Sequence, residues 1–420
     1  MVEETSERRE RLLGRKRLFR RLPPTAVPVT GSDLWRGLAA ILEQQSALDQ
    51  FRSVLMERTG SPHCYLVSSG RAGLTLILLG LKHLSGRTQV VVPAYGCPTV
   101  LQSVLKAGLE PVLCDVSPET LDLDRTALQR LINPEVLAVV PVHLYGWAQD
   151  VRDLLTTGEE HGFYVIEDAA QSFGATFQGR MVGSWGDAGF YSLGRGKCIP
   201  AGHGGVIVCQ ERCAPVVSKA IQDSGIQAVT WDMASLLLFA GYGLATHPVG
   251  WWFVARTPLN PNDAGMHAEA LPPINLRGLS AIQAGIGMSI LARLDQILAV
   301  RRDNASRLMA QLAEFDFVNL PEIAPGAEPV FLRLPFVVKG EERANRLFDL
   351  LSREGVGVSR SYWRTLPDLF SAVVPSDEQD YPGASCLASC LLTLPTHAYL
   401  REEDFERIAE AFRAVNSQGD

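Results

Sequence analysis

Three segments of the sequence place charged or reactive side chains beside glycine and serine, a combination that suits ligand binding. The first, SSGRAGL (Ser68–Leu74), opens an amphipathic helix with serine and glycine. Free backbone N–H groups at such a helix start bind phosphate, and Arg71 adds a cation. Ordinary helix capping is the alternative interpretation of this segment.

The other two segments contribute carboxylates and a lysine. In FYVIEDAAQSFGA (Phe163–Ala175) a hydrophobic run leads directly into two acidic residues, which either face a cleft or are solvated in a loop. In GDAGFYSLGRGKCIPAGHGGVIVC (Gly186–Cys209), Lys197 lies in a glycine-rich turn with Ser192 just before it. The glycines allow a bulky ring to approach the backbone closely, although a lysine in such a turn is often solvent-exposed.

These three parts match what pyridoxal 5′-phosphate (PLP) requires of a protein. The helix start binds the phosphate, and Lys197 forms a Schiff base with the cofactor. Asp168 keeps the pyridine nitrogen protonated, so that the ring can accept electrons. The sequence therefore favours a PLP site, in which Lys197 and Asp168 are the catalytic residues.

The elements that position these residues alternate along the chain. Short β-branched runs alternate with stretches of helical spacing, which predicts an α/β fold with a mainly parallel sheet flanked by helices. The predicted strands are Gln89–Pro93, Pro111–Val116, Leu137–Leu144, Phe163–Ile166, Gly189–Ser192 and Gly205–Cys209. The predicted helices between them are Arg71–Leu84, Pro98–Ala107, Asp124–Leu131 and Asp150–His161. Ligand sites in such sheets form at the carboxyl ends of the strands.

A smaller α+β unit is predicted to follow this sheet. Apolar spacing predicts one long helix over 278–315. The later predicted elements are strands at Pro329–Val338 and Gly355–Ser359 and helices at Glu341–Glu354 and Arg401–Val415. The predicted parts are a basic N-terminal arm (1–28), a large domain (29–300) with an apolar insertion at about 229–258, and a small C-terminal domain (301–420).

Composition narrows the class of protein. The chain has 420 residues, of which 46% are hydrophobic, and a net charge of −7, which argues against disorder and against nucleic-acid binding. Eight cysteines are too sparse for a disulfide scaffold, and no apolar signal segment opens the chain, so we expect a cytoplasmic enzyme. No metal site is expected. The pairs Cys209/Cys213 and Cys386/Cys390 can each share a helical face, but they lack histidines at zinc-finger spacing.

Two segments allow more than one interpretation. Residues 1–22 carry eight basic and four acidic side chains, which fits either a solvated, partly helical arm or an amphipathic anchor for anionic lipid or an acidic partner. Residues 233–255 contain no charged side chain. This stretch is expected to be a buried or subunit-interface helix, or to touch a membrane surface. Its three glycines and Pro248 disfavour a membrane span.

Longer motifs resemble those of the DegT/DnrJ/EryC1/StrS family of sugar aminotransferases. The likeness runs through VVVPAYGCPTVLQSVLKAGLEPVLCDVSPETLDLD, VVPVHLYGWAQDV, VIEDAAQSFGA, GSWGDAGFYSLGRGK, GGVIV and INLRGLSAIQAGIG, and more faintly through YPGASCLASCLLTLPTH. It covers about residues 60–415 in the family's order. The resemblance implies a fold-type I PLP-transferase with a large domain, a small C-terminal domain and a homodimer with shared active sites.

The resemblance also implies roles for individual residues. Lys197 occupies the Schiff-base position of an S-x-x-x-x-K turn. Asp168 of EDAAQ takes the position of the pyridinium partner, and Gln171 takes the position beside the ring hydroxyl.

The phosphate contacts are implied in the same way. Ser192 matches the family's phosphate-contacting serine. Gly70 and Arg71 match its Gly-Thr loop, with arginine in place of the usual threonine. Asn275 resembles the asparagine that reaches the phosphate of the neighbouring subunit.

Two positions depart from the family pattern. Cys97 stands where an aromatic side chain commonly covers the ring, so either Cys97 itself or another side chain such as Tyr95 is expected there. His203 stands where a small or acidic residue is usual.

The resemblance implies amino transfer to a keto sugar, for which a nucleotide-linked form is expected, with glutamate as the expected amino donor. One alternative keeps PLP but performs elimination or dehydration, or acts on a carbonyl compound that is not a sugar. The other is a catalytically idle homologue that serves in assembly or at a membrane surface. The intact Lys197 and Asp168 argue against an idle protein.

Overall fold

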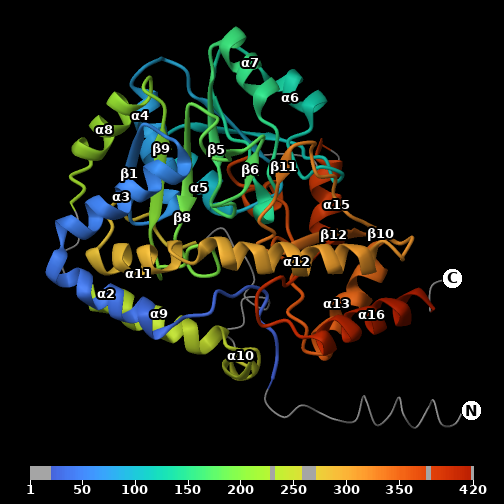
Figure 1. The fold of residues 1–420 in the computed structure, drawn as a ribbon. Helices are drawn as coiled ribbons and strands as arrows, with labels where there is room; N and C mark the ends of the chain where they lie inside the picture. Colours follow the sequence, from blue (N-terminus) through green and yellow to red (C-terminus); the bar gives the residue numbers. More distant parts are fainter. Residues whose placement is uncertain (1–19, 228–231, 258–270, 375–379, 418–420) are drawn as a thin grey trace, which may run out of the picture.

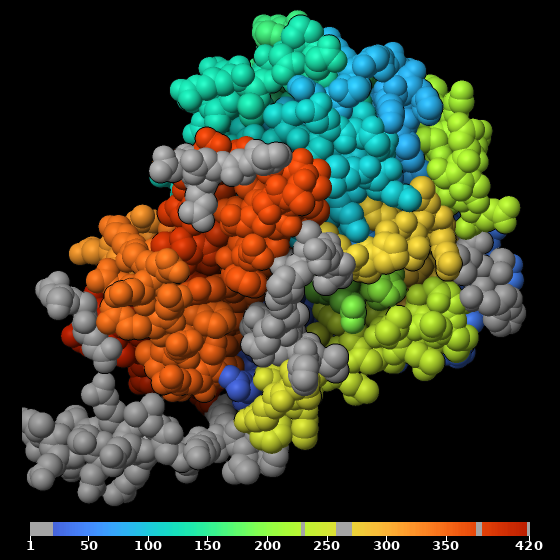
Figure 2. Space-filling model, turned by 180° about the vertical axis from the view of Figure 1, so that it is seen from behind, coloured from blue at the N-terminus to red at the C-terminus, as the bar shows by residue number. Residues whose placement is uncertain are grey.

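The computed structural model describes residues 20–227, 232–257, 271–374 and 380–417. Two lobes are visible in Figure 1 and, from behind, in Figure 2. The large lobe contains most of the chain before helix α12 (Leu294–Leu312), and the small lobe, coloured orange to red, contains the C-terminal part.

A seven-stranded sheet forms the centre of the large lobe, with the order β1-β9-β8-β5-β4-β2-β3. Neighbours from β8 to β3 pair in parallel, whereas β9 is antiparallel to both β8 and β1. The strands are β1 (His63–Val67), β2 (Gln89–Pro93), β3 (Glu110–Cys114), β4 (Val136–Val139), β5 (Tyr164–Asp168), β8 (Ala188–Ser192) and β9 (Gly205–Cys209). β4 and β9 are buried along their whole length, as expected for strands covered on both faces. The predicted α/β fold with a mainly parallel sheet is confirmed.

One predicted strand is shorter than expected. The hydrophobic run Leu137–Leu144 forms a strand only as far as Val139, since Pro141 has no N–H to donate to the ladder. The chain then enters a single 3-10 turn, η1 (Leu144–Gly146).

Helices pack around the sheet, and α4 is the one that bears on the site. Ser69 caps α4 by accepting a hydrogen bond from the N–H of Ala72, and α4 packs directly on β8 and β9. The helices of this lobe are α2 (Gly31–Glu43), α3 (Gln45–Thr59), α4 (Gly70–Lys82), α5 (Pro98–Lys106), α6 (Arg125–Leu131), α7 (Arg152–His161), α8 (Ala214–Asp223), α9 (Met233–Thr246), α10 (Pro248–Val254) and α11 (Ala281–Leu291). Cys209 ends β9 and Cys213 precedes α8, so the expectation that they could share a helical face is wrong.

The predicted single helix over 278–315 is also wrong, because two helices occupy that range. α11 ends at Leu291, and α12 (Leu294–Leu312) begins after Arg293, whose φ of −121° is not helical. Arg293 donates to the backbone oxygen of Pro28 and to Oδ2 of Asp33, at 2.8 and 2.7 Å. These contacts fix the interruption between α11 and α12 at Arg293. The apolar spacing of the sequence continues across the interruption and therefore does not predict it.

The small lobe contains an antiparallel sheet, β10 (Val318–Asn319), β12 (Leu334–Val338) and β13 (Leu391–Leu394). Its helices are α13 (Glu341–Arg353), α14 (Leu366–Leu369), α15 (Pro382–Cys390) and α16 (Glu402–Asn416). Another small sheet joins β11 (Ala327–Glu328) to β6 (Thr176–Phe177) and β7 (Arg180–Met181) of the large lobe.

Two strand predictions for this lobe need correction. The strand expected at Pro329–Val338 begins only at Leu334, because a turn with Phe331 at φ +46° precedes it. Of Gly355–Ser359, only Ser359 forms a β-bridge, to Thr393.

Residues 20–28 pack against both lobes and form what we call the arm seam. Arg20 donates to Asp404 at 2.9 and 2.8 Å, and His397 Nε2 lies 2.8 Å from the backbone oxygen of Pro23. Arg301 donates to the backbone oxygen of Ala26 at 2.9 Å. The expectation of a solvated arm is therefore wrong for residues 20–22, while residues 1–19 lie outside the described part of the chain.

The uncharged stretch 233–255 forms α9 and α10, which meet at the His247–Pro248 step. Phe239 and Trp251 are buried, whereas Leu237 and Leu244 are 70% and 75% exposed. In the described residues no helix combines the length and the apolar character that crossing a membrane requires. The stretch is thus a half-buried helical pair, and its contact with a membrane surface remains a prediction.

Candidate active site

The three segments that the sequence singled out meet at one edge of the sheet. β5 ends in Asp168, which pairs in parallel register with Phe190 of β8. The turn that contains Lys197 follows β8, and the start of α4 lies beside the start of β9 through a bridge between Ser69 and Gly204. The parallel arrangement of β5 and β8 thus brings a carboxylate, a lysine and a helix N-terminus together.

The start of α4 approaches its neighbours so closely that only glycine fits. A Cβ on Gly70 would lie 3.3 Å from both the Phe190 ring and the Cβ of Ser192. A Cβ on Gly205 would lie 2.3 Å from the backbone carbon of Ser69. The backbone N–H groups at this start, with Ser192 beside them, form a cradle that suits a phosphate.

Of the predicted phosphate contacts, Arg71 bonds elsewhere in the single subunit, and Asn275 contacts the helix start only through its backbone. Arg71 donates through Nη1 to the backbone oxygen of Pro272 at 2.8 Å. The exposed Asn275 lies beside the same helix start, since its backbone oxygen accepts from Ser68 Oγ at 2.6 Å. The placement leaves the Asn275 side chain available to a second subunit, and its phosphate contact remains a prediction.

Asp168 is a buried carboxylate with one unused oxygen. Its Oδ1 accepts the N–H of Ala170 at 2.9 Å, and no described residue donates to Oδ2. Burial raises the pKa of Asp168, while the Ala170 N–H and the charge of Lys197 act in the opposite direction. A cationic ring N–H at Oδ2 would supply the missing partner.

Lys197 presents an amine that lacks a hydrogen-bond acceptor within the described chain. The turn places Gly196 at φ +73°, a conformation that favours glycine, and the N–H of Lys197 bonds back to Gly194. Burial lowers the pKa of Lys197, partly opposed by Cys97 and Asp168, and Arg333 lowers it further. A lowered pKa increases the fraction of neutral amine, the form that attacks an aldehyde carbon or accepts a proton.

Gln171 is held on both sides of its amide. Its Oε1 accepts the backbone N–H of Tyr145 at 3.2 Å, and its Nε2 donates to the hydroxyl of Tyr362 at 3.0 Å. Tyr145 has a φ of +57°, a strained conformation for a residue other than glycine. Such strain is often found at functional sites, and here it orients a predicted cofactor contact.

The donor set fits PLP. The cradle at α4, the free oxygen of Asp168 and the unpaired amine of Lys197 provide for the phosphate, the ring nitrogen and the aldehyde of the cofactor. These residues are the predicted Gly70, Ser192, Asp168 and Lys197.

Comparison with known families decides the class of protein. The model of the DegT/DnrJ/EryC1/StrS aminotransferase family matches residues 39–413. The chain belongs to this family. The aminotransferases of the family depend on PLP, so the predicted enzyme class and cofactor are confirmed, against the alternative of an idle homologue.

Individual relatives support the same family assignment. The chain is 28% identical over 371 residues to GDP-perosamine synthase from Caulobacter vibrioides, covering 87% of this chain and 89% of that protein. It is 33% identical over 190 residues to the L-glutamine:2-deoxy-scyllo-inosose aminotransferase of Streptomyces fradiae, covering 45% of each. The crystal structure of the sugar aminotransferase CalS13 from Micromonospora echinospora superposes with a TM-score of 0.75 at 23% identity, over 94% of this chain and 99% of that one. This likeness confirms the fold-type I architecture.

Tyr95 and Cys97 are the two candidates to cover the cofactor ring in this DegT/DnrJ/EryC1/StrS enzyme, and they lie in different surroundings. Tyr95 is buried, with its hydroxyl 3.2 Å from that of Tyr145 and its ring edge-on to Tyr362. Cys97 is partly exposed, and its thiol lies 3.0 Å from Thr99 Oγ1. Cys97 also lies close enough to Lys197 to influence its pKa. That one of them covers the ring remains a prediction, and the partly exposed Cys97 is the more accessible of the two.

His203, the other departure from the family pattern, is exposed in the turn before β9. Partial burial and the neighbouring charge of Arg195 lower its pKa, and Arg71 contributes in the same direction. His203 precedes Gly204, whose bridge to Ser69 places this turn beside the phosphate cradle.

Sequence reasoning missed His143, which lies behind Asp168. Its Nδ1 accepts the N–H of Gln149 at 3.0 Å, so Nε2 carries the proton and donates to Glu167 at 2.9 Å. Glu167 in turn accepts the N–H groups of Gly183 and Gly186. The VVPVHLYGWAQDV motif contained His143, but nothing in its spacing linked it to Asp168.

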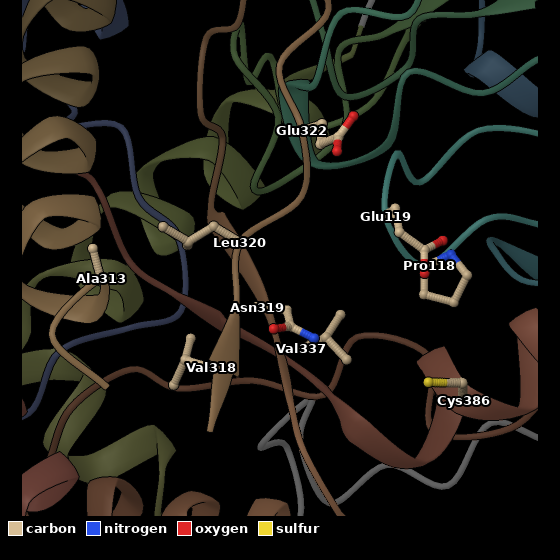
Figure 3. Close-up of a pocket in the computed structure, with 9 residues that line it drawn as sticks. All are labelled: Pro118, Glu119, Ala313, Val318, Asn319, Leu320, Glu322, Val337 and Cys386. Atoms are coloured by element: carbon tan, nitrogen blue, oxygen red, sulfur yellow. The ribbon is translucent and has the colours of Figure 1, made fainter. Parts of the chain in front are cut away.

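A separate groove lies between the lobes, away from these residues. Figure 3 shows Pro118 and Glu119 of the large lobe facing Cys386 and the strand residues around Asn319. The groove has a volume of about 600 Å³ and contains neither Lys197 nor Asp168. Within the described ranges, no group of three or more potential ligands is placed to hold a metal ion.

Proposed function

We propose that this enzyme transfers an amino group from glutamate to the carbonyl carbon of a nucleotide-linked keto sugar. The observation that carries the proposal is the convergence of Lys197, Asp168 and the α4 cradle in an aminotransferase of this family. The 28% identical GDP-perosamine synthase supports a nucleotide-linked sugar as the acceptor.

PLP supplies an aldehyde for covalent exchange with amines and a ring that delocalises electrons from the reacting carbon. The protein's residues hold and move protons around it. Oδ2 of Asp168 would accept the N–H of the ring nitrogen and so keep that nitrogen charged. Lys197 Nζ, as a neutral amine, would take the proton from the α-carbon of the donor and deliver it to the carbon on the other side of the nitrogen, two bonds away. When the keto sugar is the reactant, Lys197 Nζ would move the proton in the opposite direction.

The walls of the site limit side reactions. Gln171 is fixed by Tyr145 and Tyr362, so its amide is oriented before any ligand binds. The buried Tyr145 lies against the partly buried Tyr362, with ring centroids 6.3 Å apart, which limits the access of water to this wall of the site.

A homodimer with shared active sites and a cytoplasmic location are parts of the same proposal. The exposed Asn275 beside α4 supports the shared site. All eight cysteines are unpaired, which suits a reducing compartment.

A second candidate keeps the chemistry and changes the acceptor to a cyclic ketone that is not a sugar, with glutamine as donor. The relative that acts on 2-deoxy-scyllo-inosose supports it.

The test is a two-stage assay of the PLP-loaded protein. Glutamate and glutamine are added separately, and the cofactor band at roughly 400–430 nm is followed as it converts to the amine form. A panel of nucleotide-linked keto sugars and cyclitol ketones is then added, and amino products are identified by mass spectrometry. An aminated nucleotide sugar supports the first candidate, and an aminated cyclitol supports the second. Absence of conversion by either donor contradicts both and favours elimination or dehydration.

A further inference from the structure

The uncharged helices α9 and α10 expose apolar side chains that the mechanism above does not use. The opposite side of α9 is fixed to the protein: Phe239 is buried, and the hydroxyl of Tyr242 accepts the N–H of Val27 at 3.3 Å. These contacts set the rotation of the helix, so Leu237 and Leu244, seven residues apart, are both held towards the outside. The exposure of these leucines is therefore a fixed feature of the fold.

Helix α2 extends the exposed apolar surface. α2 and α9 lie side by side on α11, on the side of α11 opposite the seven-stranded sheet (Figure 1). The exposed apolar residues of α2 are spaced by three and four positions, which puts them on one side of that helix. Exposed apolar surface of this extent marks a contact with a partner or with a membrane. We call it the apolar face, and its main residues are Trp35, Leu38, Leu42, Leu237, Leu244 and Phe253.

The N-terminal arm joins the protein at this face. The N–H of Arg21 donates to the backbone oxygen of Pro248, the first residue of α10, at 3.0 Å. The arm is strongly basic, since residues 8–21 carry eight basic side chains and one acidic side chain. Burial lowers the pKa of Arg21, and the charge of the nearby Arg256 lowers it further. Positive charge thus enters the fold beside the apolar face, although the whole chain has a net charge of −7.

Trp252 and Arg256 form a boundary between the apolar face and this charge. The guanidinium carbon of Arg256 lies 3.7 Å from the centre of the Trp252 ring, and Nη1 donates to the backbone oxygen of Trp252 at 2.6 Å. The adjacent Phe253 is 56% exposed. Tryptophan and arginine suit the boundary between lipid tails and phosphate headgroups, because each combines an apolar surface with a polar group.

We propose that the apolar face and the basic arm bind the surface of a membrane that contains anionic lipids. The exposed leucines and Phe253 would enter the region of the lipid tails, and the arginines would remain at the phosphate headgroups. A second copy of this chain fits the face less well, because a twofold contact would bring the basic segments of both copies to one interface. The inference does not depend on which carbonyl compound the enzyme aminates.

The experiment uses the whole chain loaded with PLP and measures its binding to vesicles by flotation. One set of vesicles is pure phosphatidylcholine, and the other contains about one third phosphatidylglycerol, which is anionic. We expect the wild type to bind the anionic vesicles about 10-fold more tightly or better, and to lose affinity as the salt concentration rises. Equal affinity for both sets, or binding to neither, would overturn the inference.

The apolar part of the contact is tested with a double variant. Leu237→Gln/Leu244→Gln should weaken binding to anionic vesicles by about 10-fold or more, because two leucines no longer enter the lipid. Leu84→Gln, which replaces a half-exposed leucine after α4, is the matched control and should bind as the wild type does. If the double variant also binds as the wild type does, the apolar face is not the lipid contact and the inference is wrong.

The charged part is tested in the arm. Arg15→Gln/Lys16→Gln/Arg17→Gln removes three positive charges and should weaken binding by about 10-fold at low salt and by less at high salt. The control is Lys219→Gln, an exposed position on α8, which should not change binding. An intact cofactor band and melting temperature would show that the variants are folded. An arm variant with unchanged affinity at low salt would contradict the proposed role of the arm.

Sedimentation velocity separates lipid binding from a contact between subunits. Leu237→Gln/Leu244→Gln should keep the oligomeric state of the wild type. A smaller species would assign the apolar face to a second copy and overturn the inference. Amino transfer measured without vesicles is a separate readout: its failure would contradict the proposed function, whereas vesicle binding would still decide the membrane contact.

Discussion

Two arginines near the junction of the lobes, Arg301 and Arg333, are treated differently by the protein around them. In the arm seam, Arg301 is fully buried and donates to the backbone oxygens of Ala26 and Leu332. Next to Tyr362, Arg333 has a single serine as its hydrogen-bond partner in the described chain, and the side chain of Lys197 has none there. Burial lowers the pKa of both arginines and of the lysine.

The difference separates structural charges from functional ones. Where the chain supplies acceptors, as for Arg301, the cation joins the arm, α12 and the turn before β12. Where the chain withholds them, the site is prepared for an anionic or electrophilic ligand at a cost in stability. Substitutions in the two regions should therefore have opposite consequences.

The largest effect is expected at Lys197. Lys197→Ala should reduce amino transfer by about 10²–10⁴-fold or more, because the proton carrier is lost. The melting temperature should not fall, since the amine has no partner to lose. Single-turnover rates measure the first effect, with the exposed Lys219→Ala as the matched control. A Lys197→Ala variant with a normal rate would contradict the assigned role.

Next comes the seam arginine. Arg301→Met should lower the free energy of unfolding by about 2–4 kcal/mol, because two buried backbone oxygens lose their donor. Arg333→Met should cost less or even stabilise the fold, since only Ser361 loses a partner. Urea unfolding of both variants measures the difference, and the reverse order would break the comparison.

A smaller and pH-dependent effect is expected at Asp404. Burial alone would raise the pKa of Asp404, but the hydrogen bonds and charge of Arg20, with Arg407, hold it below the ordinary value. Its contribution to stability is thus present above a carboxyl pKa of about 3.9 and is lost as the pH falls through the lower folded value. Asp404→Asn should cost about 1–3 kcal/mol at pH 7. The difference from the wild type should shrink below about pH 4, as urea unfolding across pH would show. A constant difference would contradict the charged pairing.

The smallest effect is expected at the exposed pair Arg307–Glu402, which lies outside both regions. Arg307→Gln should leave the melting temperature and the reaction with glutamate unchanged, because water screens this pair. A clear loss in either measurement would show that the effect of replacing an arginine does not depend on whether it lies in the arm seam or near Lys197.

The sequence predicted the part of the site that lies at strand ends. Lys197, Asp168 and Gly70 sit in motifs whose neighbours in space follow from parallel strand order, so local sequence was sufficient. The break between α11 and α12 was not predictable, because it depends on Arg293 reaching Pro28 and Asp33 far along the chain.

Arg333 and Tyr362 were missed for the same reason. Both come from the small lobe: Tyr362 meets Gln171 through a hydrogen bond, and Arg333 follows a turn that docks on Gly146 through Val330. Neither lies in a motif, and no periodicity marks them. Their positions depend on contacts between segments that are far apart in the sequence, and local sequence patterns do not predict such contacts.

The most direct measurement is the identity of the lysine that binds the cofactor. The PLP-loaded protein is treated with borohydride, which makes the bond between cofactor and lysine permanent, and its peptides are analysed by mass spectrometry. The chain contains six lysines, and we predict that Lys197 alone carries the reduced cofactor. Modification of a different lysine, or no modification in a protein that binds PLP, would contradict it.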